Sequence, residues 1–122
     1  MIDTHTHIYL EEFDIDRDAV MQRAIDAGVK CMILPNVDME TFSPMQRLHA
    51  DYPDITFPAM GLHPTSVNAD YKEVLDKTVC EIKRGGYVAV GEVGLDYYWD
   101  TTFKEEQKIV LIEMLRVAKS TN

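Results

Sequence analysis

Four short β-rich runs alternate with longer amphipathic segments along the chain, and this alternation constrains the fold more than any other feature. Strands are expected over residues 2–5, 30–34, 55–62 and 87–92, each followed by a stretch with helical spacing. Because parallel strands joined by helices cross over right-handedly, four βα units in series form a small open sheet or half of a (βα)8 barrel. A complete barrel typically has about 250 residues. The 122 residues of this chain are about half of that number.

Capping and stop signals predict where the helices begin and end. Asp38 is expected to cap the second helix, and Gly28 and the pair Gly85-Gly86 to end the first and third. The sequence Thr102-Phe103-Lys104-Glu105 has the pattern of a capping box and predicts the start of the last helix there. That helix is expected to turn four apolar side chains inward, namely Leu111, Met114, Leu115 and Ala118.

The composition is that of one globular domain over residues 1–122. With 46% hydrophobic residues the chain can bury a core, and no apolar run is long enough to span a membrane. The start lacks a basic region followed by an apolar stretch, so we expect a cytoplasmic protein in which Cys31 and Cys80 are reduced. The net charge of −9 argues against nucleic-acid binding through a broad basic surface, but not against an enzyme that holds phosphate through metal ions.

Polar residues follow three of the predicted strands at their carboxyl ends. His5 and His7 end the first strand, and since strand side chains alternate, they project to the same side about 6.5 Å apart along the strand. His63 follows the third strand and Glu92 ends the fourth. If the strands are neighbours in sequence order, these groups meet at one rim, where (βα)8 enzymes build their sites. Two imidazoles and a carboxylate there suit one divalent metal ion.

Each of these residues also has a simpler interpretation. An isolated His-x-His pair is more often a pair of surface histidines, and His63 before Pro64 could be merely a loop histidine. Glu92 could bind a neighbouring backbone N–H or a lysine, although the flanking glycines 91 and 94 permit close backbone approach and favour a site residue. The aromatic residues 97–99 could stack on nucleic-acid bases or could cover the end of the barrel.

Three segments give the chain a specific resemblance: residues 2–7 (IDTHTH), 61–64 (GLHP) and 90–98 (VGEVGLDYY). Together they resemble the TatD family of metal-dependent deoxyribonucleases, which are amidohydrolase-like hydrolases that cleave DNA phosphodiester bonds. The resemblance covers essentially the whole chain and implies the N-terminal half of a TIM barrel.

The resemblance also implies roles for individual residues. His5 and His7 would bind one metal ion, and Glu92 would be a catalytic carboxylate able to bridge two ions. His63 would line the site near the substrate phosphate, Tyr97 would contact substrate, and Asp96 would act catalytically or shape the loop. One or two divalent ions are implied, with Mg²⁺ as the first expectation and Mn²⁺ or Zn²⁺ as alternatives.

The chain departs from the family pattern in two respects. Tyr9 stands where the family usually has Asp or Asn, two residues after the second histidine. Family members also supply ligands from the second half of the barrel, beyond the length of this chain. We therefore expect a truncated form that could be inactive alone, or a half-barrel completed by a second half or by a partner copy, as a homodimer or larger assembly formed through exposed sheet edges.

Two other functions are compatible with the sequence. One is a non-catalytic half-barrel that acts by self-association or by binding a partner. The other is an amidohydrolase-like enzyme acting on a small amide or ester, which would share the His-x-His start. The segment 91–97 (GEVGLDY) is what favours the TatD type over the second of these.

Overall fold

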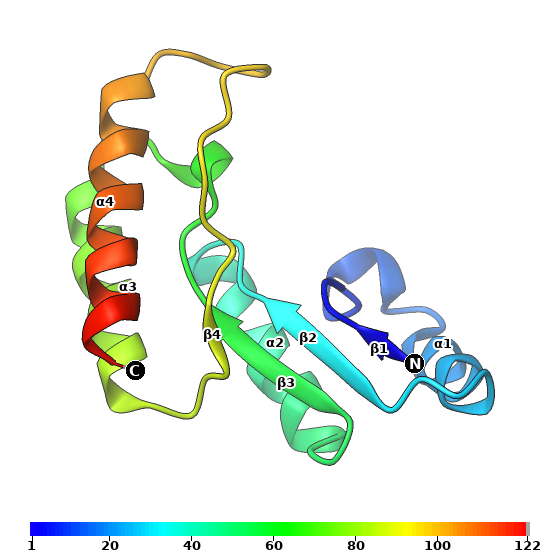
Figure 1. Ribbon diagram of the computed structural model, residues 1–122. Coiled ribbons are helices and arrows are strands. Elements are labelled where there is room, and N and C mark those ends of the chain that lie inside the picture. The colour runs from blue at the N-terminus through cyan, green and yellow to red at the C-terminus, as the bar shows by residue number, and fades with distance from the viewer. Residues whose placement is uncertain (122) are drawn as a thin grey trace.

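The computed structural model describes residues 1–121, and it contains four βα units in series (Figure 1). Each strand is followed by a helix, as the alternation of the sequence predicts. Two short 3₁₀ helices, η1 and η2, lie in the loops after β1 and β3. The elements are β1 (Ile2–Asp3), η1 (Glu11–Phe13), α1 (Arg17–Asp26), β2 (Cys31–Pro35), α2 (Met39–Asp51), β3 (Thr56–Met60), η2 (Pro64–Ser66), α3 (Tyr71–Arg84), β4 (Ala89–Val90) and α4 (Lys104–Ser120).

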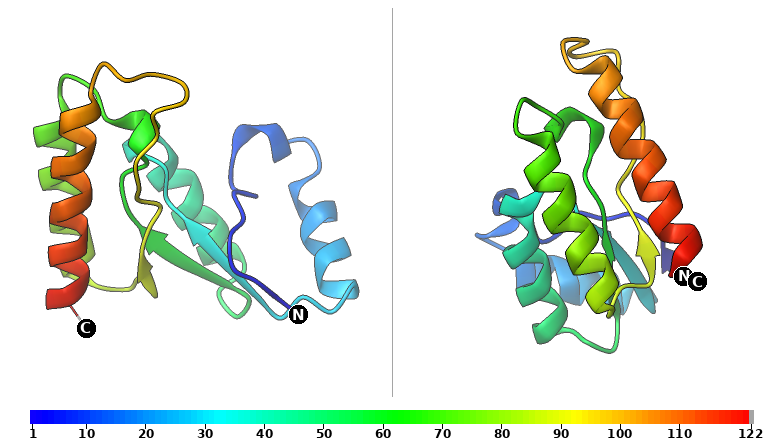
Figure 2. Two further views of the ribbon diagram at one scale, coloured as in Figure 1. Left: turned by 45° about the horizontal axis from the view of Figure 1, so that its top comes forward. Right: turned by 90° about the vertical axis from the view of Figure 1, so that its left-hand side faces the viewer.

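The four strands form one parallel sheet in the order β1-β2-β3-β4. Neighbours in sequence are therefore neighbours in space, which confirms the fold predicted from the sequence: a curled half-barrel that matches the N-terminal half of a TIM barrel (Figures 1 and 2). Because all four strands run the same way, their carboxyl ends meet at one rim of the sheet.

The edge strands are shorter than expected. Strand β1 ends at Asp3 rather than His5, and β4 covers only Ala89–Val90 of the predicted 87–92. Each edge strand has a partner on one side only, so fewer ladder hydrogen bonds fix its ends. One further backbone bond follows each edge strand: the Thr6 N–H donates to the Ile33 carbonyl, and the Gly91 N–H donates to the Met60 carbonyl.

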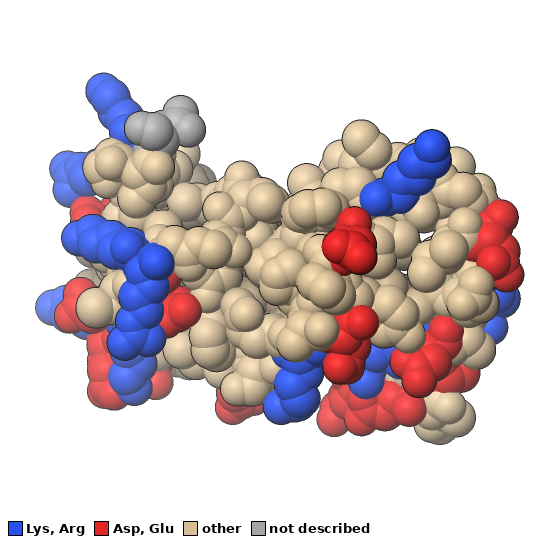
Figure 3. Space-filling view, turned by 90° about the horizontal axis from the view of Figure 1, so that it is seen from below, with Lys and Arg blue, Asp and Glu red and all other residues tan. Residues whose placement is uncertain are grey.

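The two faces of the sheet differ in burial. Leu34 and Met60 are fully buried in the core that the sheet shares with the helices. On the opposite face Ile33 and Phe57, which pair across β2 and β3, are only half-buried, and Ile2 is 63% exposed. In the space-filling view from below, the molecule is hollowed between the side that carries α3 and α4 and the side that carries α1. The surface there is mostly tan (Figure 3). The face that would line the inside of a closed barrel is therefore accessible in this chain.

Helix α2 begins as the sequence predicts. The Asp38 carboxylate accepts hydrogen bonds from the N–H groups of Glu40 and Thr41, at 3.0 and 2.9 Å, and the Thr41 hydroxyl accepts the Asp38 N–H in return at 3.0 Å. This reciprocal pair is a capping box. It fixes the turn between β2 and α2, which lies beside the candidate site.

Two predictions for α4 are wrong. The helix starts at Lys104 with no side-chain cap, because the Thr102 hydroxyl bonds the Asp100 carboxylate at 2.7 Å instead of the helix N-terminus. Leu115, expected to point inward, is 59% exposed together with Ile109 and Ile112, whereas Met114 is buried as predicted. Met114, Val110 and Val117 form the inner stripe of the helix, and the exposed residues lie on its other side.

Among the described helices, none has the length and apolar content to cross a membrane.

Candidate metal centre

Three side chains from opposite edges of the sheet meet at the carboxyl rim. His5 and His7 follow β1, and Glu92 follows β4. One ligand atom from each of these three residues lies within 4.8 Å of the others. The sequence pattern predicts that the strand ends share one rim. The curvature of the sheet, which that pattern does not specify, brings the two edges near one another.

An extra residue in β1 explains why the two histidines face this site. Asp3 pairs with Met32 on the helix-packed face, so an unbroken ladder would place Thr4 opposite Ile33. The Thr6 N–H donates to the Ile33 carbonyl, one residue later than that ladder requires, and the chain bends at Thr4. Such a bulge shifts the alternation by one residue. His5 therefore shares the accessible inner face with Ile33.

The donor atoms of the three side chains form a tight triangle. The Nε2 atoms of His5 and His7 lie 2.9 Å apart, and they lie 3.1 and 3.3 Å from Oε2 of Glu92. Nitrogen and oxygen ligands about 2.1 Å from one ion lie about 3.0 Å apart in octahedral and about 3.4 Å apart in tetrahedral geometry. The separations observed match this range. The residues present therefore fit a single divalent ion bound by two imidazoles and one carboxylate.

The protonation state of the site suits a metal ligand. Burial lowers the pKa of His7 below its ordinary value, Glu92 opposes that shift, and the charge of His5 adds to it. Burial likewise raises the pKa of Tyr9, which lies beside His7, above its usual range. Both groups are therefore neutral at neutral pH, and a metal-ligating histidine has to be neutral.

His63 adds a fourth group with a different role. Its Nδ1 accepts a hydrogen bond from the backbone N–H of Thr65 at 3.2 Å and contacts the Thr65 hydroxyl at 2.6 Å. Because a backbone N–H only donates, the ring proton of neutral His63 sits on Nε2. That nitrogen lies 3.3 Å from Oε1 of Glu92. His63 thus presents a hydrogen-bond donor to the site, and Pro64 begins the short helix η2 that holds it there.

Two backbone features hold Glu92 in place. Its N–H donates to the carbonyl of Asn36 at 2.9 Å, which ties the end of β4 to the end of β2. Gly61, at the end of β3, lies against the same peptide: a Cβ on Gly61 would come within 2.6 Å of the Glu92 carbonyl oxygen. The absence of a side chain at position 61 is therefore what allows the Glu92 backbone to approach β3.

A Gly61→Ala substitution is expected to lower the free energy of unfolding by about 1–3 kcal/mol, because the new methyl group meets backbone atoms that cannot rotate away. Urea denaturation of the purified chain measures this change. Gly94→Ala is the matched control, since the nearest atom to its Cβ would be Pro64 Cγ at an ordinary 4.0 Å. Equal stability of the two variants would show that the close approach at position 61 carries no constraint.

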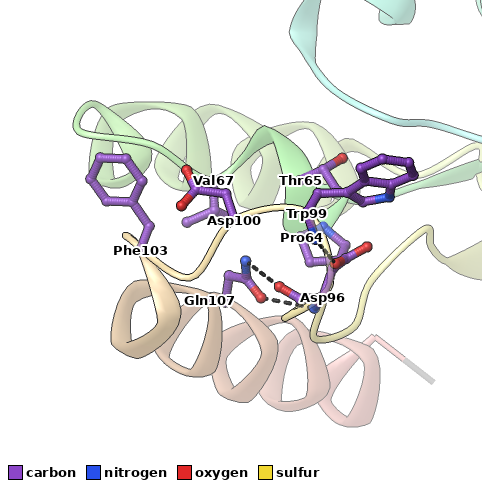
Figure 4. Close-up of a pocket in the computed structure, with 8 residues that line it drawn as sticks. All are labelled: Pro64, Thr65, Val67, Asp96, Trp99, Asp100, Phe103 and Gln107. Atoms are coloured by element: carbon purple, nitrogen blue, oxygen red, sulfur yellow. Dashed lines mark hydrogen bonds between the residues drawn. The ribbon is translucent and has the colours of Figure 1, made fainter.

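Asp96 lies outside the metal triangle and organises the loop after it. Its carboxylate accepts hydrogen bonds from the N–H groups of Tyr98 and Trp99, at 2.9 and 3.3 Å. Its backbone is held by Gln107 of α4, whose side-chain amide bonds the Asp96 N–H at 2.9 Å and the Asp96 carbonyl at 3.0 Å (Figure 4). The contacts of Asp96 are those of a loop-shaping residue, one of the two roles that the resemblance implies.

The aromatic residues of this loop are exposed rather than packed over the sheet. Tyr98 is 83% and Trp99 77% exposed, and their rings meet edge to face with centroids 4.8 Å apart. Tyr97 is 39% exposed, with the Lys104 ammonium 4.8 Å from its ring centroid. Trp99 and Phe103 line a small cavity of about 80 Å³ between the loop, η2 and α4 (Figure 4).

Asn36 and Tyr9 support the site, and sequence reasoning missed these roles. Asn36 follows the buried β2 directly and is itself fully buried, with its side chain bonded to three neighbouring groups. A polar residue at the end of an apolar strand and two residues before a helix cap is a signal that could have identified it. Tyr9 is noticed in the sequence only as a departure from the family pattern.

Comparison with known proteins agrees with this geometry. The family model described as TatD related DNase matches residues 2–122. The "Uncharacterized metal-dependent hydrolase YjjV" of Escherichia coli K12 is 36% identical over 97% of this chain and 46% of its own length. The "3'-5' ssDNA/RNA exonuclease TatD" of Shigella flexneri is 28% identical over 100% of this chain and 46% of its length.

A solved structure supports the fold as well. The crystal structure of YjjV, a TatD homologue from Escherichia coli K12, superposes with a TM-score of 0.79 over 98% of this chain and 47% of that chain. This chain spans about half the length of the relatives it matches. With a family match over residues 2–122 and the three motifs meeting at one rim, the chain belongs to the TatD-related DNase family of metal-dependent hydrolases.

Proposed function

We propose that the site binds a divalent cation, Mg²⁺ in the first instance and Mn²⁺ or Zn²⁺ as alternatives, and serves the hydrolysis of phosphodiester bonds in DNA. The observation that carries this proposal is the triangle of His5, His7 and Glu92, with donor atoms 2.9–3.3 Å apart at the carboxyl rim of a parallel sheet. When bound, such an ion supplies Lewis-acid stabilisation of developing charge and makes water more acidic. The name of the Shigella relative, a 3'-5' ssDNA/RNA exonuclease, supports a single-stranded substrate.

His63 binds the phosphate in this proposal. Its Nε2–H points into the site and lies 3.3 Å from Glu92, so it donates to an anionic oxygen there. A phosphate oxygen placed beside Glu92 would accept this hydrogen bond. His63 therefore differs from His5 and His7. It donates a hydrogen bond, whereas the Nε2 atoms of His5 and His7 are placed to bind the ion.

The loop of residues 97–99 binds the bases of the substrate. With a net charge of −9 the chain has little basic surface for the phosphate backbone, so metal ions and stacking have to supply the affinity. Tyr98 and Trp99 are exposed, and the Asp96 carboxylate holds the backbone on which they stand. Of the two sequence interpretations of these aromatic residues, this exposure supports base stacking, and it includes Tyr97 as a flanking contact.

The single tryptophan of the chain makes the stacking proposal directly measurable. Titration with single-stranded oligothymidine is expected to quench the Trp99 fluorescence. A Tyr98→Ala variant should bind a labelled oligonucleotide about 5- to 150-fold more weakly, corresponding to about 1–3 kcal/mol per stacked base. Ile15→Ala, at a position that is 98% exposed, is the control for loss of a surface apolar group. Binding that is unchanged in Tyr98→Ala would exclude the loop as a base platform.

The catalytic part of the proposal is tested with an end-labelled single-stranded oligonucleotide and a large excess of the chain. Cleavage is expected with Mg²⁺ or Mn²⁺, and it should disappear with a chelator and in Glu92→Gln. Metal binding without any cleavage would favour the alternative function, a half-barrel that acts by self-association. The observation that favours this alternative is the half-buried inner sheet face with Ile2 63% exposed, and a dimer in sedimentation at micromolar concentration that binds the ion but cleaves no oligonucleotide would support it.

A further inference from the structure

Tyr9 occupies a buried position directly behind the candidate metal centre. Only 1% of its surface is exposed, and its hydroxyl makes two contacts. It donates a hydrogen bond to the carbonyl oxygen of Pro35, at the end of β2. It also lies 2.7 Å from Nδ1 of His7.

A count of the available protons fixes the direction of both bonds. A phenol has one proton, and a carbonyl oxygen has none, so the contact with Pro35 uses the Tyr9 proton. The contact with His7 is then a hydrogen bond only if Nδ1 of His7 carries a hydrogen and donates it to the Tyr9 oxygen. Since a neutral imidazole has a single N–H, Nε2 of His7 is left with a free lone pair. This nitrogen lies 2.9 Å from Nε2 of His5 and 3.3 Å from Oε2 of Glu92, a carboxylate that competes for a proton on Nε2. The contact between Nδ1 and the Tyr9 oxygen is shorter, at 2.7 Å, and it favours the proton on Nδ1.

The backbone around Tyr9 is held so that the ring cannot reorient easily. The guanidinium of Arg17 donates to the carbonyls of Ile8, Tyr9 and Leu10, at 2.9, 3.2 and 2.7 Å. The Leu10 N–H closes the turn by donating to the His7 carbonyl at 2.9 Å. These bonds fix the turn that joins the metal-site histidines to the buried phenol.

We propose that Tyr9 is a positioning residue that fixes the tautomer of His7 and aims its Nε2 lone pair into the site. A metal-ligating histidine is usually oriented by an acceptor on its other nitrogen, and carboxylates and carbonyls are common acceptors. Here a neutral phenol relays the bond to the Pro35 carbonyl, so it orients the histidine without adding negative charge. The tautomer assignment stands on the hydrogen-bond pattern alone, whereas its effect on metal binding rests on the proposed function.

The tautomer is measured on the metal-free chain with ¹⁵N-labelled histidine. Long-range ¹H–¹⁵N correlation spectra at pH 8 distinguish a protonated ring nitrogen from one with a lone pair, and a His7→Gln spectrum assigns the His7 signals. The wild-type chain is expected to show His7 protonated at Nδ1. In Tyr9→Phe, which keeps the ring and removes the hydroxyl, His7 should become a mixture of tautomers, and Mn²⁺ affinity should fall between about 10-fold and 100-fold. Tyr52→Phe, which removes a remote hydroxyl bonded to Asp18, should leave both quantities unchanged.

The outcomes separate this inference from the proposed function. His7 protonated at Nε2 in the wild-type chain would overturn the assignment, whether or not any variant folds. A Tyr9→Phe variant with an unchanged His7 tautomer would also overturn it. The predicted tautomer in a wild-type chain that binds no Mn²⁺ would support the role of Tyr9 and count against the metal site instead.

Discussion

Divalent-metal affinity is expected to fall by at least about 100-fold in Glu92→Gln, more than the 10- to 100-fold typical for loss of an outer-sphere partner. Glutamine keeps the size of the side chain but removes the only negative charge among the three clustered ligands. Three imidazoles surround this carboxylate at 3.1–3.3 Å, so no neighbouring group replaces the lost charge. The loss of affinity should therefore exceed that in Tyr9→Phe and in Asn36→Ala.

The measurement is Mn²⁺ titration by calorimetry, supported by thermal unfolding with and without the ion. At a concentration 100 times the dissociation constant, an ion that binds only the folded chain stabilises it by about 2.7 kcal/mol. The wild-type chain should show this gain and Glu92→Gln should not. Glu81→Gln is the control, because Glu81 is similarly shielded but bonds Arg84 and Tyr87 away from the rim. Equal Mn²⁺ affinity in wild type and Glu92→Gln would contradict the site as described.

Asn36→Ala is expected to lower the free energy of unfolding by about 3 kcal/mol. The Asn36 side chain donates to the carbonyls of Asp38 and Gly61, at 2.7 and 3.2 Å, and accepts from the Thr41 hydroxyl at 3.1 Å. Removing it leaves buried polar groups without partners, which costs more than the net value of the bonds themselves. The backbone carbonyl of Asn36 accepts the Glu92 N–H, so a shift of this backbone after loss of the side-chain bonds should lower the metal affinity as well.

Urea unfolding and Mn²⁺ titration test the two parts of this prediction together. Asn68→Ala is the matched control, since Asn68 is exposed and its side chain accepts one bond, from the Asp70 N–H at 3.1 Å. The control should lose less than about 1 kcal/mol. A similarly small loss in Asn36→Ala would show that the ends of β2, β3 and α2 hold together without this side chain.

The sequence was a good guide to the fold because each βα unit carries its own local signals. Apolar strands, the Asp38 cap and the glycine stops are all readable within a few residues, and parallel order follows from the helical connections. The edge strands were less predictable, since their length depends on the partner across the sheet. The Thr102 capping pattern failed because Asp100 competes for the same hydroxyl, at 2.7 Å.

The sequence predicts which residues cluster at the candidate site, but not which residues hold them in place. The carboxyl ends of parallel strands share a rim, so His5, His7 and Glu92 were expected to meet, and they do. Simple alternation from Asp3 does not show which side of the sheet the histidines face, since the extra residue at the Thr4 bend decides it. The roles of Asn36 and Tyr9 depend on carbonyl groups from other strands, which no local pattern specifies.

The location of a bound ion is the most direct test of the central claim. Crystals of the chain soaked in Mn²⁺ and measured for anomalous scattering should show a peak about 2.0–2.3 Å from Nε2 of His5, Nε2 of His7 and a carboxylate oxygen of Glu92. A peak bound by other residues, with these three side chains turned away from one another, would contradict the account.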